Sequence, residues 1–204
     1  VSNSFAALFD EFFPNWQYEP ESLKNIDKVD SNALWDAHFK AKTELLHFAN
    51  SQLSKALDPN ILTIGFARRA ATYKRAQLIF KEPEKLIDLG AGKIQLVFSG
   101  KAHPNDKEGK ELISGIIQNA KDFEGKIKII YLENYNMWLG KLITSGVDVW
   151  LNTPLRPNEA SGTSGMKSAL NGIPNLSILD GWWDEGCNDK VNGWSIGSSE
   201  HVDD

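Results

Sequence analysis

The stretch "ILTIGFA", residues 61–67, is apolar throughout rather than alternately apolar and polar. Such a run is typical of a strand that is buried on both faces of a parallel sheet. Similar runs occupy 94–100, 127–132, 147–153 and 174–179, and a sixth candidate strand is 193–197. Between the first five runs lie amphipathic segments that predict helices near 72–87, 108–122, 136–145 and 163–171. This alternation predicts an α/β fold with a doubly wound, parallel, six-stranded sheet of the Rossmann-like type.

The residues before this sheet have a helical pattern. Aromatic and aliphatic residues recur at three- and four-residue steps from Phe5 to Phe13, and Pro14 ends the run. A second apolar face runs from Leu34 to Phe48, with Asp30 or Ser31 as the expected N-cap. We therefore predict an N-terminal helical segment, 1–57, that packs on a Rossmann-like domain formed by 58–204.

Composition limits the classes of partner. The chain has 204 residues and a net charge of −5, which argues against nucleic acid or an anionic membrane as the main partner. Its one cysteine, Cys187, fits a reducing compartment, so we expect a cytoplasmic location. No apolar run approaches the length needed to span a bilayer, and no His/Cys/Asp spacing predicts a metal site. The chain opens on Val1 rather than Met, and we expect it to be a piece of a longer protein.

Basic residues follow the first predicted strand in "RRAATYKR", residues 68–75. In a helix that begins near Thr72, Lys74 and Arg75 would fall in the first turn, where cations oppose the helix dipole. A bound anion would reverse that penalty. A solvated basic face is the alternative, but the position at a strand end favours an anion site.

A second candidate site follows the fourth predicted strand, in "NEASGTSGMKSALNG", residues 158–172. The backbone N–H groups of 161–165 can open a helix and bind a phosphate. Lys167 lies four residues after Thr163, on the same helical face and about 5.4 Å further along the axis. That offset suits a ligand with a phosphate at one end and a carbonyl carbon at the other, captured as a Schiff base; pyridoxal phosphate is one. From spacing alone, a surface lysine after a glycine-rich cap is the alternative.

The lysine segment closely resembles the pyridoxal-phosphate segment of the α-glucan phosphorylases, the glycogen and maltodextrin phosphorylase family. "RRAATYKR" resembles the family's phosphate-binding motif, and "YLENYNMWLGKLITSGVDVWLNTP" resembles the stretch between the two. "LFDEFF", "LWDAHFKAK", "SGKAHPND" and "DGWWDEG" are similar to the shorter, unregulated branch of that family. The resemblance covers nearly the whole chain in collinear order.

The resemblance implies a role for each matching residue. Lys167 matches the lysine that carries pyridoxal phosphate and, as its anchor, counts with the catalytic residues. The other residues expected at the cofactor are Thr163, Ser164, Arg68, Tyr135 and Asn136. The family often has Gly at the position of Ser164, and its better-studied members have Arg at that of Asn136. Arg69 and Lys74 match the catalytic pair that binds substrate phosphate. The residues that match those holding the hydroxyls of the transferred glucose are Glu159, Ser161 and Gly162.

The implied reaction is the cleavage of terminal glucose from an α-1,4-glucan by inorganic phosphate, with retention, to give glucose 1-phosphate. In this family the active site closes between two domains. We therefore expect an amino-terminal domain of the same enzyme as a partner, a possible homodimer, and little activity in this piece alone.

Two other readings stay open. A sugar-nucleotide glycosyltransferase of the same two-domain (GT-B) architecture often places a second glutamate eight residues after the first, to bind the ribose. Here that position, eight after Glu159, is Lys167, which cannot accept those hydrogen bonds. The third reading is a non-catalytic cofactor- or sugar-binding domain.

Overall fold

The computed structural model describes residues 1–52 and 56–197. In this part of the chain a six-stranded sheet has the order β3-β2-β1-β4-β5-β6, and all pairs are parallel. The strands are β1 (Leu62–Ala67), β2 (Ile94–Ser99), β3 (Lys128–Leu132), β4 (Val149–Asn152), β5 (Asn175–Ile178) and β6 (Gly193–Ile196). The prediction of a doubly wound parallel sheet is confirmed. The chain winds outward from β1 to β3 and then returns to the other side of β1, so the strand order reverses between β1 and β4.

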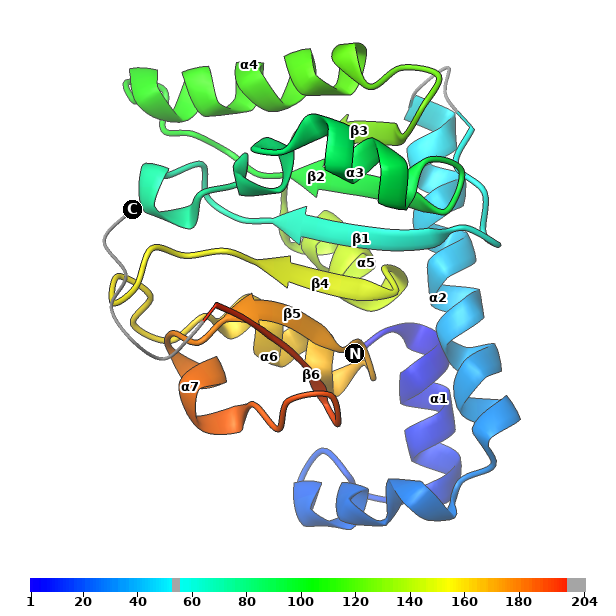
Figure 1. Cartoon of the computed structure of the whole chain (residues 1–204). Helices are drawn as coiled ribbons and strands as arrows, with labels where there is room; N and C mark the ends of the chain where they lie inside the picture. The colour runs from blue at the N-terminus through cyan, green and yellow to red at the C-terminus, as the bar shows by residue number, and fades with distance from the viewer. Residues whose placement is uncertain (53–55, 198–204) are drawn as a thin grey trace.

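Helices cover both faces of the sheet (Figure 1). The α-helices are α1 (Asn3–Phe12), α2 (Ser31–Gln52), α3 (Pro83–Gly90), α4 (Lys107–Asp122), α5 (Met137–Gly146), α6 (Thr163–Leu170) and α7 (Trp182–Gly186). Three 3₁₀ segments are η1 (Pro20–Lys28), η2 (Thr72–Lys74) and η3 (Leu78–Phe80). One face packs against α2 and α5, in a core that includes Leu45, Ile143 and Trp150, each fully buried. The other face packs against η3 and α4, in a core that includes Phe80, Phe98 and Ile116.

The helix predicted over 72–87 is wrong, and the structure replaces it with two short 3₁₀ turns and α3. Arg75 adopts a left-handed conformation, with φ of 46°, and this ends the first turn. Pro83 stands at the start of α3, where proline's fixed φ suits a helix and its missing N–H costs nothing. Lys74 and Arg75 therefore do not lie in the first turn of a long helix, and the dipole argument does not apply to them.

Helix α2 lies near the end of the sheet at which the strands begin (Figure 1). A buried cluster joins α2 to the start of β1 and to Asp148, the residue before β4. Lys42 Nζ donates to Asp148 Oδ2 at 2.6 Å, His38 Nε2 lies 2.8 Å from Asp148 Oδ1, and Thr63 N donates to Asp148 Oδ2 at 2.7 Å. Burial alone would raise the pKa of the Asp148 carboxyl, but these hydrogen bonds outweigh it and lower the pKa. His38 therefore has a structural position, and the cluster fixes the N-terminal helices to the sheet.

A largely apolar groove of about 960 Å³ lies beside this cluster, between α1, α2 and the starts of β1 and β4. Trp35, 60% exposed, lines it. No helix among residues 1–52 and 56–197 is long and apolar enough to cross a membrane.

Candidate active site

The carboxyl ends of β1 and β4 meet where the strand order reverses, which is the usual ligand position in an open α/β sheet. Arg68 directly follows β1, and Asn152 is the last residue of β4. The Arg68 guanidinium donates to Asn152 Oδ1, and Asn152 Nδ2 donates to Ser177 Oγ of β5 at 3.1 Å. A line of polar contacts therefore crosses three adjacent strands at this edge.

Glu159 receives two buried cations at the same edge. Arg68 NH1 lies 2.7 Å from Glu159 Oε2, and Lys74 Nζ contacts the same oxygen. All three side chains are at most 7% exposed. Burial alone would raise the pKa of the Glu159 carboxyl, but the hydrogen bonds and charges of Arg68 and Lys74 outweigh it and lower the pKa. We call these three residues the Glu159 cluster; it holds two positive charges against one negative charge.

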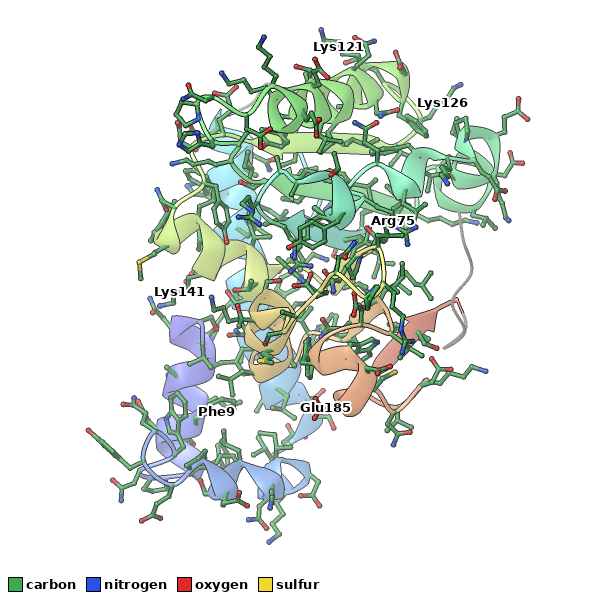
Figure 2. The ribbon with its side chains drawn as sticks, turned by 90° about the vertical axis from the view of Figure 1, so that its left-hand side faces the viewer. Phe9, Arg75, Lys121, Lys126, Lys141 and Glu185 are labelled. Atoms are coloured by element: carbon green, nitrogen blue, oxygen red, sulfur yellow. The ribbon has the colours of Figure 1, made fainter. Side chains whose placement is uncertain are left out.

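Backbone hydrogen bonds tie the loop after β1 to the loop after β4. Thr153 Oγ1 donates to the carbonyl oxygens of Lys74 and Arg75, both at 3.1 Å, and Leu155 N donates to Tyr73 O at 2.6 Å. The Arg75 side chain also binds this loop, because its Nε donates to Thr153 O at 3.2 Å. Figure 2 shows Arg75 beside the yellow loop that follows β4. These contacts explain the left-handed turn at Arg75, and they position Lys74 toward Glu159.

The loop that follows β5 also holds the Glu159 backbone in place. Asp180, which follows β5, accepts the Glu159 backbone N–H at 2.9 Å, and Trp182 N donates to Ser161 O at 2.8 Å. Gly181 has a φ of 59°, and a Cβ there would lie 2.6 Å from Ser161 O, so only glycine fits. The sequence around 180–182 therefore determines where Glu159 and Ser161 lie.

Helix α6 begins directly after the loop that follows β4, which carries Glu159 and Ser161. Gly162 is its N-cap with a φ of 82°, and the first N–H groups of a helix have no partner within the helix. A Cβ on Gly165 would lie 2.6 Å from Asn175 Oδ1 and 2.8 Å from Trp182 Nε1, so the first turn is packed closely against β5 and α7. Ser164 Oγ is buried and, within the described residues, has no hydrogen-bond partner. The start of a helix, where backbone N–H groups are free, is a general binding site for anions such as phosphate or carboxylate.

A model of the carbohydrate phosphorylase family matches residues 3–185. The chain belongs to this family. It is 44% identical to the maltodextrin phosphorylase of Thermococcus litoralis, over 84% of the chain and 22% of that protein. It is 42% identical to the glycogen phosphorylase of Mycobacterium tuberculosis, over 91% of the chain and 24% of that protein, and 42% identical to that of Aquifex aeolicus, over 98% and 32%. The chain thus spans about a quarter to a third of the length of these curated relatives.

The structure brings some of the predicted phosphorylase site residues together and leaves others apart. Arg68, Lys74 and Glu159 meet in one cluster. Arg69 and Lys167 are both exposed, and in the part of the chain that the structure describes neither side chain takes part in a hydrogen bond or an ion pair. Lys167 lies in α6, as predicted, but no described contact links it to the Glu159 cluster. Both cations are therefore available to a ligand.

Tyr135 and Asn136 precede α5, beyond the end of β3. Burial raises the pKa of the half-buried Tyr135 phenol, and the positive charge of Arg68 lowers it by less. Asn136 is the N-cap of α5, and its Oδ1 accepts the Leu139 N–H at 2.8 Å. This capping role explains an asparagine here without any ligand.

Three residues of the site were not predicted from the sequence: Asn152, Thr153 and Asp180. Each is polar and stands at or just after the end of an apolar strand. That position alone could have singled them out, because carboxyl strand ends form the ligand-binding edge of a parallel sheet.

Proposed function

We propose that this chain is the cofactor- and phosphate-binding part of a retaining α-1,4-glucan phosphorylase, which cleaves terminal glucose from glycogen or maltodextrin with inorganic phosphate to give glucose 1-phosphate. The observation that carries the proposal is the Glu159 cluster, where two buried cations converge at the β1/β4 edge of the sheet. Family membership and the names of the relatives support the same reaction.

The residues around the start of α6 fit pyridoxal phosphate. Gly162 and Gly165 have no side chain to cover the helix start, although both are buried, and the buried Ser164 hydroxyl has no hydrogen-bond partner within the described residues. The exposed Lys167 side chain takes part in no described hydrogen bond or ion pair, so its amine is available to an aldehyde. Thr163 and Ser164 would hold the cofactor phosphate at the helix start, and Lys167 would anchor the aldehyde carbon. When bound, the cofactor would supply a phosphate group that could assist proton transfer to the leaving glycosidic oxygen.

The chain's own residues manage charge and orientation. Two phosphates held close together repel each other, so a cluster of cations is required to hold both. Arg68 would help to hold the cofactor phosphate, whereas Arg69 and Lys74 would bind substrate phosphate and stabilise its charge as the glucosyl group is transferred. The Glu159 carboxylate accepts hydrogen bonds from the glucose hydroxyls, and the backbone N–H groups of 161–162 donate to them. Together these contacts orient the anomeric carbon.

The rest of the enzyme completes the site. The chain spans only part of the length of its relatives, so we infer that an amino-terminal domain of the same enzyme closes over this edge. We also propose that the whole enzyme acts in the cytoplasm and that it can form a homodimer. We expect the 204-residue chain alone to release little or no glucose 1-phosphate from maltodextrin. Robust release by the chain alone would contradict this inference.

Borohydride trapping tests the cofactor assignment. The chain is incubated with pyridoxal phosphate, reduced, digested and mapped by mass spectrometry. We expect a near-ultraviolet absorbance and one modified peptide, which contains Lys167. The Lys167→Met variant should lose both signals. The control variant Lys141→Met should keep both, because Lys141 lies on the exposed side of α5, where it binds Asn3. Modification elsewhere, or tight binding of ADP-glucose without cofactor absorbance, would instead favour a sugar-nucleotide glycosyltransferase.

A further inference from the structure

The Glu159 carboxylate lies where an anionic ligand of Arg68 and Lys74 would have to lie. One oxygen, Oε2, contacts both cations, and the cluster is almost closed to solvent. Arg68 and Lys74 come from the loop after β1, while Glu159 comes from the loop after β4, 85 residues after Lys74. A phosphate oxygen and a carboxylate oxygen make the same charge-assisted hydrogen bonds to a guanidinium and an ammonium group. The two anions therefore compete for one position.

We propose that Glu159 is an internal ligand of the phosphate site, and that phosphate bound at Lys74, with Arg68 beside it, displaces the Glu159 carboxylate from both cations. This inference rests on the proposed function, and it assigns Glu159 a second role besides binding sugar. It predicts that the acidic residue weakens phosphate binding in the chain without sugar, although it belongs to the same site.

Displacement has a consequence for the sugar. While Glu159 Oε2 accepts from both cations, that oxygen is unavailable to glucose hydroxyls. Once phosphate takes over the cations, both carboxylate oxygens can accept hydrogen bonds from sugar. Phosphate and glucose should therefore strengthen each other's binding by the same factor, as thermodynamic linkage requires. The coupling would favour assembly of both substrates before reaction.

The loops around the cluster allow such a movement of the side chain without refolding. The Glu159 backbone is held by Asp180 at 2.9 Å, and Lys74 is held by the bonds of its own carbonyl oxygen to Thr153. Neither anchor involves the Glu159 carboxylate. Rotation of the Glu159 side chain thus breaks the ion pairs while the backbone contacts that define the site remain.

Calorimetric titration with inorganic phosphate tests the proposal on the 204-residue chain. We expect Glu159→Gln to bind phosphate roughly tenfold or more tightly than the unmodified chain, because an amide competes less well for charged donors. The matched control is Glu185→Gln on α7 (Figure 2), which removes the same charge from an exposed position and should change phosphate affinity less than about twofold. Phosphate binding by Glu159→Gln that is unchanged or weaker, in a variant with the native circular dichroism spectrum, would overturn the proposal.

A measurement on the unmodified chain keeps the proposal testable if Glu159→Gln does not fold. With carboxyl-¹³C glutamate, the Glu159 resonance should shift during a phosphate titration, with the same Kd as the calorimetric one. A Glu159 resonance that does not move at phosphate saturation would refute displacement. The two proposals also fail separately: cofactor trapping at Lys167 without a gain in Glu159→Gln removes only this inference, and a gain without trapping removes only the proposed function.

Discussion

Asp148→Asn tests what fixes the N-terminal helices to the sheet. The substitution keeps the shape of the side chain but removes the charge that faces Lys42, whose side chain is 5% exposed, and His38, whose side chain is 10% exposed. An uncompensated buried ammonium group is costly, and breaking a buried pair typically lowers the free energy of unfolding by about 3–5 kcal/mol. For a chain of this size, that loss corresponds to a fall in Tm of roughly 6–20 °C, at about 2–4 °C per kcal/mol.

The assay is urea unfolding followed by circular dichroism. The matched control is Asp36→Asn, an exposed residue of α2, the helix that carries Lys42 and His38. The sign of the pH dependence follows from the lowered pKa of Asp148 in the folded chain. Its contribution is complete above the pKa of the unfolded state and is lost as pH falls through the folded pKa, so the difference between Asp148→Asn and the unmodified chain should shrink in acid. A loss below about 1 kcal/mol at neutral pH, equal to that of Asp36→Asn, would refute the reasoning.

Three further predictions concern the site. Gly165→Ala should lower the free energy of unfolding by about 1–3 kcal/mol and weaken pyridoxal phosphate binding, because its Cβ would press on Asn175 and Trp182; parallel urea and absorbance titrations measure both, and a stabilised variant would contradict the close packing. Asn136→Ala should cost about 1 kcal/mol of stability through the lost α5 cap while cofactor affinity stays within twofold; a large loss of cofactor affinity in absorbance titrations would show that Asn136 is a cofactor ligand instead. In the whole enzyme, Arg69→Ala should weaken phosphate use by about 2–5 kcal/mol and glucan binding much less, and an equal loss in the kinetic constants for both substrates would mean that Arg69 is structural.

The sheet could be predicted from the sequence because its strands are apolar on both faces. Each of the six predicted runs contains the strand that the structure has. The predicted ranges of α1, α4, α5 and α6 match the structure within one or two residues at each end, whereas α2 extends to Gln52, beyond the predicted end at Phe48. The connection from 72 to 87 failed for a physical reason. Its conformation is decided by hydrogen bonds to Thr153 and Leu155, about 80 residues away, and no local pattern reports those contacts.

The site was predictable in its residue types and less so in its pairings. Arg68 and Lys74 attract attention because they are cations at a strand end, and Glu159 through its segment's resemblance to a family. Their mutual contact depends on which strands are neighbours, because only the order with β4 beside β1 brings the two loops together. Asp180 was missed for the same reason, since its role is to hold the Glu159 backbone.

The separation of 85 residues between Lys74 and Glu159 also bears on how the protein acquires its site. During synthesis, a nascent chain that has only reached β3 already contains both cations but not their carboxylate, so neither can be buried at low cost. The ligand-binding edge therefore forms late, after β4 has inserted beside β1, and a product truncated before residue 159 could not close it.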